Sequence, residues 1–313
     1  MSTTQPSVQN STGTAKALKP TKRDLYQETT NKIITLLENG VLPWRRTWSQ
    51  YGLAKNYVSG KAYKGINMIL MNNTAYNIPY FLSFKQAKEL GGTIKKGAKA
   101  EQVLYFKLTF KDENGKVLSQ ETATQYKKAG RVVKVLRFLR YFSVFNIADI
   151  EGIEYDIPEV ELKDNEQIEK CDQLVLDMPN PPKFETTNTD KAFYAPLLDL
   201  INMPSIKQFE NSAEYYSTLF HEMIHSTGHE TRLNRTGISE LDKKAKNEYS
   251  KEELIAEMGA AFLCATTGID YDAVTENSAA YINGWLKVLK ADKRFIFQSA
   301  AAAQKAANYI LGE

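Results

Sequence analysis

Apolar residues recur at two different periods along the chain, and the change between them predicts two structural regions. In residues 103–110 and 132–146 apolar and polar residues alternate, with many β-branched and aromatic side chains. This period of two is typical of antiparallel strands, and the polar residues 112–128 between them indicate a hairpin connection. Helices are predicted at 22–38, 67–73 and 84–90. We therefore expect an α+β domain before residue 150.

The helical period dominates the second region. We predict a helix over 165–178 that ends at the Pro179–Pro182 segment, followed by short strands around 191–194 and 198–201. A long helix over 211–227, closed by Gly228, comes next, and alanine-rich helices follow over 276–311. The pattern Ser250-Lys251-Glu252-Glu253 predicts a capping box that opens another helix. The fold class is therefore α+β, with an N-terminal antiparallel-sheet domain and a mainly helical second domain.

Charge divides the chain at the same place. Residues 21–150 hold 22 lysines and arginines against 9 acidic residues, a net of +13, and residues 151–313 hold 16 against 28, a net of −12. This segregation indicates two units with different partners, of which the basic one faces a polyanion. The predicted parts are a disordered tail (1–20), a basic domain (21–150), an acidic linker and helix (151–182) and a second domain (183–313).

Composition excludes several classes of protein. The polar residues at 1–20 are not typical of a signal peptide, and no run of about 18 apolar residues occurs, so we expect no membrane partner and a cytoplasmic location. Cys171 and Cys264 form no CxxC pair and have apolar neighbours. Two buried free thiols in a reducing compartment are favoured over a disulfide.

All three histidines lie within nine residues, at His221, His225 and His229. His221 and His225 are four residues apart on the predicted helix, so their imidazoles lie on one face and can converge on one metal ion. Glu222 follows His221 and is positioned to act as a general base toward a water molecule. The segment 221–225 therefore predicts an HExxH metal site.

A third protein ligand is required, and a carboxylate on the following helix is the best candidate. The pattern HExxHxxGxxH needs a histidine where this chain has Thr231. His229 follows the break at Gly228, so we expect it beside a ligand or against a partner rather than on the metal. Glu253 follows His225 by 28 residues and is predicted to complete a site for one Zn²⁺, Mn²⁺ or Co²⁺ ion per chain.

The neighbours of Glu253 on that helix have separate predicted roles. Glu257 lies one turn later on the same face, where it can accept the far N–H group of a ligand histidine. Glu252 points about 100° away, so we expect it to cap the helix or to face solvent.

Longer stretches resemble one known family. Residues 25–150 resemble the N-terminal single-stranded-DNA-binding domain of ArdC-type antirestriction proteins in LPWRRTW, KNYVSGKAYKGINMILM, SFKQAKELGGTIKKGAKAEQV and LRYFSVFNIADIEGI. From about residue 191 the chain resembles that family's zincin-like metallopeptidase domain in AFYAPLLDLINMP, YYSTLFHEMIHSTGHETRLNR, KEELIAEMGAAFLC and NSAAYINGWLKVLKADKRFIFQSAAAAQKAANYIL.

The resemblance implies a function. It implies a protein of plasmids or other mobile elements that shields incoming DNA from restriction, with non-sequence-specific binding of single-stranded DNA. It also implies a hydrolase site of the HExxH-plus-Glu type, which falls on His221, His225 and Glu253 with Glu222 catalytic. The resemblance does not identify which protein the peptidase would cleave.

Two sets of contact residues follow as hypotheses. Single-strand binders combine cationic grooves with aromatic platforms, and the candidates in the basic domain are Trp44, Arg45, Lys61, Tyr63, Lys64, Lys95 and Lys96. Tyr216 and Tyr194 are candidates for stabilising an oxyanion. Two interpretations remain: an active metallopeptidase brought to its target by a DNA-binding domain, or a DNA-coating protein whose metal is structural. An intact Glu222 favours the first.

Overall fold

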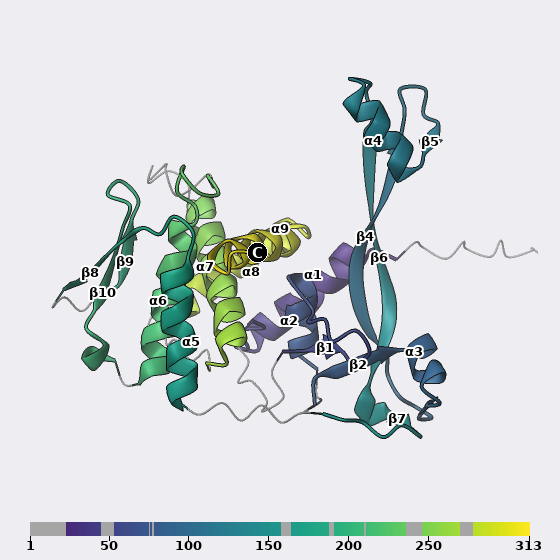
Figure 1. Cartoon of the computed structure of the whole chain (residues 1–313), viewed down its shortest axis with the longest axis horizontal. Helices are drawn as coiled ribbons and strands as arrows, with labels where there is room; N and C mark the ends of the chain where they lie inside the picture. Colours follow the sequence, from purple (N-terminus) through teal and green to yellow (C-terminus); the bar gives the residue numbers. More distant parts are fainter. Residues whose placement is uncertain are drawn as a thin grey trace, which may run out of the picture.

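The computed structural model arranges the chain as two α+β halves that lie side by side (Figure 1). Described are residues 23–44, 53–74, 76, 78–157, 164–187, 191–209, 211–235, 246–269 and 278–313. The predicted tail at 1–20 and part of the predicted linker lie outside the described residues.

The N-terminal half is built on an antiparallel sheet, as the alternating pattern predicts. Its helices are α1 (Leu25–Glu38), α2 (Ile66–Asn72), α3 (Phe84–Glu89) and α4 (Gln120–Lys128), with a 3-10 turn at Ile147–Asp149. Its strands are β1 (Lys55–Asn56), β2 (Tyr80–Ser83), β3 (Thr93–Ile94), β4 (Glu101–Lys111), β5 (Val117–Leu118), β6 (Lys134–Asn146) and β7 (Ile150–Glu151). One sheet has the order β1-β2-β6-β4-β5, in which β1 and β2 run parallel and the other pairs antiparallel. β3 and β7 form a second, two-stranded sheet.

The strands β4 and β6 form a long ribbon that leaves the body of the molecule. Val103, Leu104 and Val144 are buried at its base, and the ribbon then projects outward with β5 and α4 at its tip (Figure 1). We call residues 105–143 the arm. The predicted hairpin connection is confirmed, because β4 pairs with β6 antiparallel; the segment between the two strands also forms β5 and α4, which were not predicted.

The C-terminal half is mainly helical, as predicted. Its helices are α5 (Asp164–Asp177), α6 (Ser212–Ser226), α7 (Lys246–Thr267), α8 (Ser278–Ala291) and α9 (Phe295–Ile310), with a 3-10 turn at Ile206–Gln208. A small sheet of β8 (Lys183–Thr187), β10 (Leu200–Pro204) and β9 (Phe193–Ala195) lies beside α6; β10 runs parallel to β8 and antiparallel to β9. No helix in the described ranges is long and apolar enough to span a lipid bilayer.

The predicted start of α7 was wrong. The helix begins at Lys246, so Ser250 lies inside it rather than at its cap. A capping box is a four-residue pattern, and serine is tolerated in a helix interior at a small cost, so the pattern alone does not fix a boundary.

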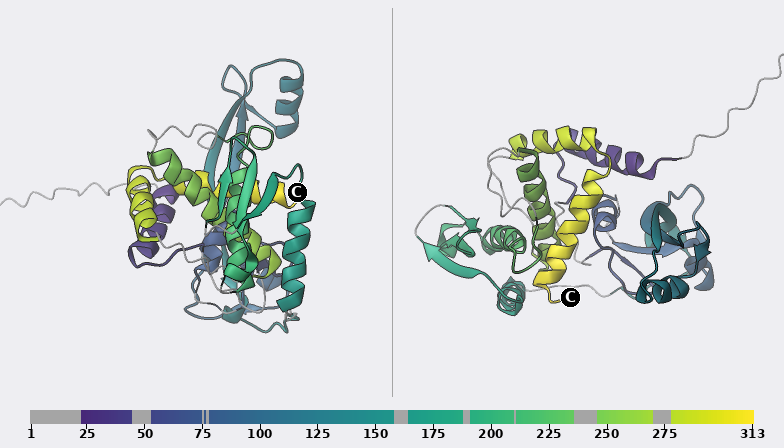
Figure 2. Two further views of the ribbon diagram at one scale, coloured as in Figure 1. Left: turned by 90° about the vertical axis from the view of Figure 1, so that its left-hand side faces the viewer. Right: turned by 90° about the horizontal axis from the view of Figure 1, so that it is seen from above.

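The two halves share one apolar core. α1 packs against α8 and α2 against α9, and the top view in Figure 2 shows α1 running beside the C-terminal helices. Trp44 from the N-terminal half meets Trp285 of α8 edge to face, with ring centroids 5.4 Å apart. Ile33 and Ile69 are fully buried in the same cluster as residues of α7 and α9. The halves are therefore held together by burial of large side chains.

Polar contacts follow the same seam. The hydroxyl of Thr30 donates to the carbonyl of Lys293 at 2.8 Å, and the Gln304 side chain accepts from the backbone N–H of Gly65 at 2.8 Å. Gly65 has φ +58, a backbone conformation that favours glycine at this position.

The two thiols are free and buried, which confirms the prediction for Cys171 and Cys264. Burial raises the pKa of the Cys171 thiol to about 11. The thiol is therefore protonated at neutral pH, as expected for a cysteine that contributes to packing rather than to chemistry.

Candidate metal centre

Helix α6 carries the HExxH segment because one of its faces is apolar and its N-terminus is capped. The side chain of Asn211 accepts from the backbone N–H of Glu214 at 2.8 Å. Phe220, Met223 and Ile224 are buried against the rest of the half. This burial fixes the rotation of the helix about its axis, so His221 and His225 lie together on the side that faces α7.

A close approach of α6 and α7 brings the acidic residues of α7 to the histidines. A Cβ atom built on Gly259 would lie 2.6 Å from the Cδ1 atom of Ile224, so the two helices meet where α7 has no side chain. Ile224 is fully buried and β-branched, and it has little freedom to move aside. Gly259 thus allows the helix spacing on which the site depends.

Three side chains converge in a geometry that fits a metal ion. The Nε2 atoms of His221 and His225 are 3.0 Å apart, and Glu253 oxygens lie 3.6 Å and 3.5 Å from them. Ligand atoms about 2.0–2.1 Å from a tetrahedral ion are separated by about 3.3 Å from one another. The separations found here match that value. Two imidazoles and one carboxylate suit Zn²⁺ and also accept Mn²⁺ or Co²⁺.

The far nitrogen of each histidine has its own carboxylate. An oxygen of Glu257 lies 3.8 Å from Nδ1 of His221, close to the far nitrogen but beyond hydrogen-bond distance, so its acceptance of that N–H group stays a prediction. An oxygen of Glu252 lies 3.4 Å from Nδ1 of His225. The expectation that Glu252 caps the helix or faces solvent was wrong: α7 is enclosed on nearly every side, so a residue 100° away from Glu253 is also buried.

Arg235 is a site residue that the sequence did not reveal. Its guanidinium donates to Glu252 at 2.5 Å, to the Thr227 hydroxyl at 2.5 Å and to the Ile224 carbonyl at 2.8 Å. Arg235 therefore has two roles. It donates to a carbonyl oxygen at the C-terminal end of α6, and it neutralises the charge of Glu252. Burial would raise the pKa of Glu252, but the bonds from His225 and Arg235 outweigh burial and hold it below its ordinary value. No local spacing connects Arg235 with the HExxH segment.

Glu222 remains partly exposed beside the cluster. It follows His221 on α6, and its negative charge contributes to the raised pKa of that imidazole. A partly exposed carboxylate next to converging donors is accessible to a substrate, as a general base must be.

The hydroxyls of Tyr216 and Tyr194, the two oxyanion candidates, are hydrogen-bonded to residues outside the three converging donors. The hydroxyl of Tyr216 donates to Asp172 on α5 at 2.7 Å, because Tyr216 precedes His221 by five residues and so lies about 140° around the helix. The hydroxyl of Tyr194 donates to Asp199 at 2.8 Å and accepts from Arg232. Both hydroxyls are committed to structural contacts.

His229 lies after the end of α6 and outside the group of three converging donors. Its Nδ1 atom is 2.9 Å from the Thr231 hydroxyl. The nearby Arg232 has no exposed side-chain surface and is held by Asp199 and by the Ser226 carbonyl, the latter at 2.7 Å. This bonding fastens the turn after α6 to the small sheet.

The carboxylates around His221 favour its protonated form. Burial disfavours the charged imidazolium, but Glu253, with Glu222 and Glu257, outweighs burial and raises its pKa from 6.5 to about 9. The imidazolium therefore stabilises the metal-free protein fully below pH 6.5, and this contribution is lost as the pH rises through 9.

The raised pKa predicts pH-dependent metal affinity. Metals bind neutral imidazole, so uptake at neutral pH must release the proton of His221. We expect the affinity for Mn²⁺ to rise about tenfold per pH unit from pH 7 to pH 9 and to level off above. Competition titrations against a chelator of known affinity measure this. The exposed Glu230, changed to Gln, is the matched control and should keep the slope; equal wild-type affinities at pH 7 and pH 8 would contradict the prediction.

The candidate DNA-binding residues are scattered by the fold. Trp44 is 1% exposed, so the prediction that it stacks on a base was wrong: its rings are covered by the shared core. Tyr63 is half-buried against Phe81, with ring centroids 6.0 Å apart. Lys64 pairs with Glu313 at 2.6 Å, and Lys95 donates to the Ala148 carbonyl at 2.8 Å. Lys61 and Lys96 are exposed, and Arg45 lies outside the described residues.

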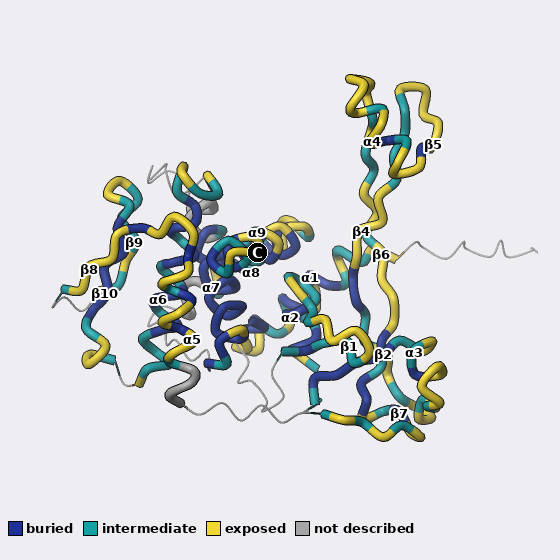
Figure 3. Tube along the Cα trace, in the orientation of Figure 1, coloured by how far each residue is buried: buried dark blue, intermediate teal, exposed yellow. Residues whose placement is uncertain are grey.

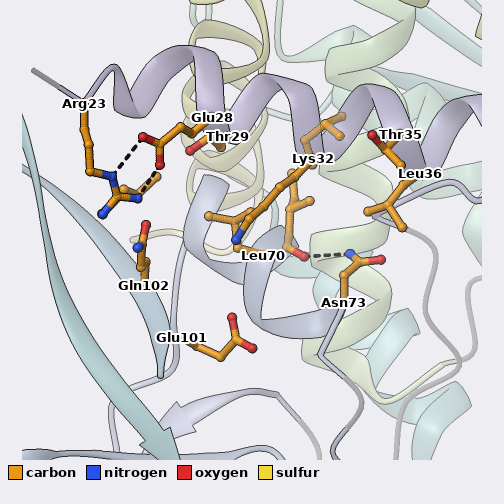
Figure 4. Close-up of a pocket in the computed structure, with 13 residues that line it drawn as sticks. Arg23, Glu28, Thr29, Lys32, Thr35, Leu36, Leu70, Asn73, Glu101 and Gln102 are labelled. Atoms are coloured by element: carbon orange, nitrogen blue, oxygen red, sulfur yellow. Dashed lines mark hydrogen bonds and ion pairs between the residues drawn. The ribbon is translucent and has the colours of Figure 1, made fainter. Parts of the chain in front are cut away.

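A cavity of about 430 Å³ lies between α1, α2 and β4 (Figure 4). Arg23 and Glu28 form an ion pair at one side of it, and Lys32 and Glu101 also line it. The histidines and Glu253 do not line this cavity, so it is separate from the metal centre.

Two families match the two halves of the chain. Residues 23–145 match the N-terminal domain of anti-restriction factor ArdC, and residues 180–303 match a zincin-like metallopeptidase family. Crystal structures of the antirestriction protein ArdC from the R388 plasmid are similar throughout. The metal-free one has a TM-score of 0.72 and 33% identity, covering 92% of this chain and 97% of that chain. The Mn(II)-bound one has a TM-score of 0.71 and 34% identity, covering 93% and 98%.

A curated relative is longer. The DNA primase TraC of Escherichia coli is 30% identical over 298 residues, which is 93% of this chain and 27% of that protein. The chain thus spans about a quarter of that relative. The zincin-like match and the Mn(II)-bound relative both point to a divalent metal at the centre formed by His221, His225 and Glu253.

Proposed function

Because the chain belongs to the ArdC antirestriction family, we propose that it binds single-stranded DNA through its N-terminal half and hydrolyses peptide bonds at a metal centre in its C-terminal half. In this proposal residues 21–150 are the DNA-binding domain, 151–182 the connection and 183–313 the peptidase domain. Together the two activities protect incoming DNA from restriction.

One observation carries the peptidase part: among the described residues three donors converge, one fewer than a structural zinc site has, and they lie beside a carboxylate. His221, His225 and Glu253 supply three ligands, whereas structural zinc sites have four protein ligands. An open position next to the partly exposed Glu222 favours catalysis over a structural role.

The residues of the chain then have distinct roles. A divalent ion held by His221, His225 and Glu253 would polarise a peptide carbonyl and acidify a water molecule. Glu222 accepts the proton of the attacking water and returns it to the leaving amine. Glu252 and Glu257 orient the histidines through their far nitrogens. Arg235 balances the charge of Glu252. This reduces the electrostatic repulsion among the three carboxylates that α7 holds in one buried cluster.

The DNA part rests on charge and on the family. The basic half carries a net +13 and the peptidase half a net −12, so a polyanion is attracted to the first and repelled by the second. We expect the full chain to bind a single-stranded oligonucleotide more tightly than a duplex of the same sequence. Affinity should fall with salt by about 0.7 log units per log unit of salt for each phosphate neutralised.

Fluorescence anisotropy over a salt series, with single-stranded and duplex probes, measures both quantities. Equal affinity for the two probes, or an affinity for the single strand that does not change with salt, would contradict the DNA part of the proposal. Such a result would not contradict the proposed role of the metal centre.

A further inference from the structure

The arm presents an exposed surface that the metal centre does not use. Its strands leave the body beyond Leu104 and Val144, and most of the ribbon and its tip are exposed in Figure 3. Residues 105–143 hold nine lysines and arginines against three acidic residues, a net of +6. A projecting, cationic two-stranded ribbon costs stability unless it contacts something, because its side chains have little core to join.

The register of β4 and β6 sorts the side chains of the arm onto two faces. Residues that are paired across the strands share a face. One face carries the successive pairs Val103 and Phe142, Tyr105 and Arg140, Lys107 and Phe138, Thr109 and Leu136, and Lys111 and Lys134. We call this the aromatic–cationic face. The pairs of the other face include Leu104 with Tyr141 and Phe106 with Leu139, and Leu139 packs against the shared core.

The aromatic rings of the aromatic–cationic face are open to solvent. Tyr105, Phe138 and Phe142 are 44%, 41% and 45% exposed, so this face presents three exposed rings together. The rings of Tyr105 and Phe142 lie side by side, with centroids 6.0 Å apart. Successive pairs on one face are about 6.8 Å apart along the strands, so the three rings form a short staggered row.

Cations alternate with these rings. Arg140 is opposite Tyr105, and Lys107 is opposite Phe138. Within the described residues neither cation has an ion-pair partner, and the three acidic residues of the arm, Asp112, Glu113 and Glu121, lie at its tip. The face therefore offers stacking surfaces and unneutralised positive charge at one place.

We infer that the aromatic–cationic face of the arm is a binding platform for single-stranded nucleic acid. This inference rests on the proposed function and assigns the contact surface for it. Unpaired bases stack on Tyr105, Phe138 and Phe142, while Arg140, Lys107 and the Lys111–Lys134 pair contact the phosphates. In a duplex the faces of the bases are already stacked on one another, so exposed rings favour a single strand.

This surface differs from the one that sequence composition suggested. Trp44 and Tyr63 pack against other side chains of the protein. The exposed rings instead lie on β4 and β6, two strands that the sequence pattern assigned to an ordinary sheet. The charge of the surface also argues against a second copy of the chain as the occupant, because two such faces would repel each other.

The test compares one variant on each face of the arm in the full-length protein. Tyr105→Ala combined with Phe138→Ala should weaken binding of a labelled single-stranded oligonucleotide by on the order of 5- to 100-fold for each base that loses its platform, with the salt slope unchanged. Arg140→Gln combined with Lys107→Gln should instead reduce the slope by about 1.4, or about 0.7 for each contact. Phe106→Ala is the matched control: the ring is 48% exposed on the other face, and binding should stay as in wild type.

A second measurement locates the contact directly. An oligonucleotide carrying 5-iodouracil, irradiated in the complex, should form crosslinks in the peptides of residues 101–111 or 134–146. Circular dichroism and thermal melting establish that each variant is folded.

The outcomes separate this inference from the proposed function. If wild type binds no single strand, the DNA part of the proposed function fails and the inference fails with it. If wild type binds but the Tyr105/Phe138 variant binds equally well, only the inference is overturned. An equal loss in the Phe106 variant, crosslinks confined to other segments, or a wild-type dimer that the variant dissociates would also overturn it.

Discussion

Glu222→Gln is expected to leave the metal in place and to reduce peptide hydrolysis by about 10²- to 10⁴-fold, the usual contribution of a positioned general base. Glutamine has nearly the same shape as glutamate but cannot accept a proton. Glu222 is not one of the three converging donors, so metal content should not change. The measurement is cleavage of denatured casein by Mn²⁺-loaded protein, with metal content determined on the same samples.

The exposed Glu230, changed to Gln, is the control for this experiment, because it removes the same charge outside the cluster. Equal cleavage by wild type and the Glu222 variant would exclude the general-base role. Restriction protection measured on the same proteins separates the two interpretations of the family function. Full protection by the Glu222 variant would favour a DNA-coating protein, and loss of protection with intact DNA binding would favour proteolysis.

Trp44→Ala is expected to destabilise the protein by about 3–5 kcal/mol, the usual cost of truncating a large buried aromatic side chain. Trp44 is 1% exposed and meets Trp285 of α8 edge to face, so its loss opens a cavity at the seam between the halves. Urea unfolding, followed by far-UV circular dichroism, measures the free energy of unfolding.

Phe84→Ala is the matched control in the same half. This side chain is 62% exposed, and surface substitutions usually change stability by about 0.5 kcal/mol or less. If Trp44→Ala leaves stability unchanged and weakens DNA binding, the indole is a stacking platform after all. That result would contradict the shared core.

Local patterns predicted the parts of the fold that depend on nearby residues. The alternation in β4 and β6 and the long helix ending at Gly228 are both found. The HExxH spacing brought His221 and His225 together because helix geometry alone decides it. Glu253 was a candidate because it lies on the helix predicted after the HExxH segment, with Glu257 one turn later on the same face.

Long-range packing decided the features that the sequence did not predict. Nothing near Trp44 distinguishes a ring for stacking on bases from a ring buried under a helix that lies more than 200 residues later. Glu252 and Arg235 meet only because the chain after α6 turns back onto α7. Which residues lie opposite each other on the aromatic–cationic face depends on the register between β4 and β6. The alternation within each strand does not define this register.

Metal content is the most direct test of the central claim that His221, His225 and Glu253 hold one divalent ion. Each protein is loaded with Mn²⁺ or Zn²⁺, dialysed against a weak chelator and analysed for metal. We expect about one ion per chain in wild type and almost none in His221→Ala. Glu253→Ala should lose more metal than Glu252→Ala. Glu253 faces both imidazoles, whereas Glu252 acts through the far nitrogen of His225. Equal loading of wild type and His221→Ala would contradict the assignment of the centre, and a larger loss in Glu252→Ala than in Glu253→Ala would contradict that of the third ligand.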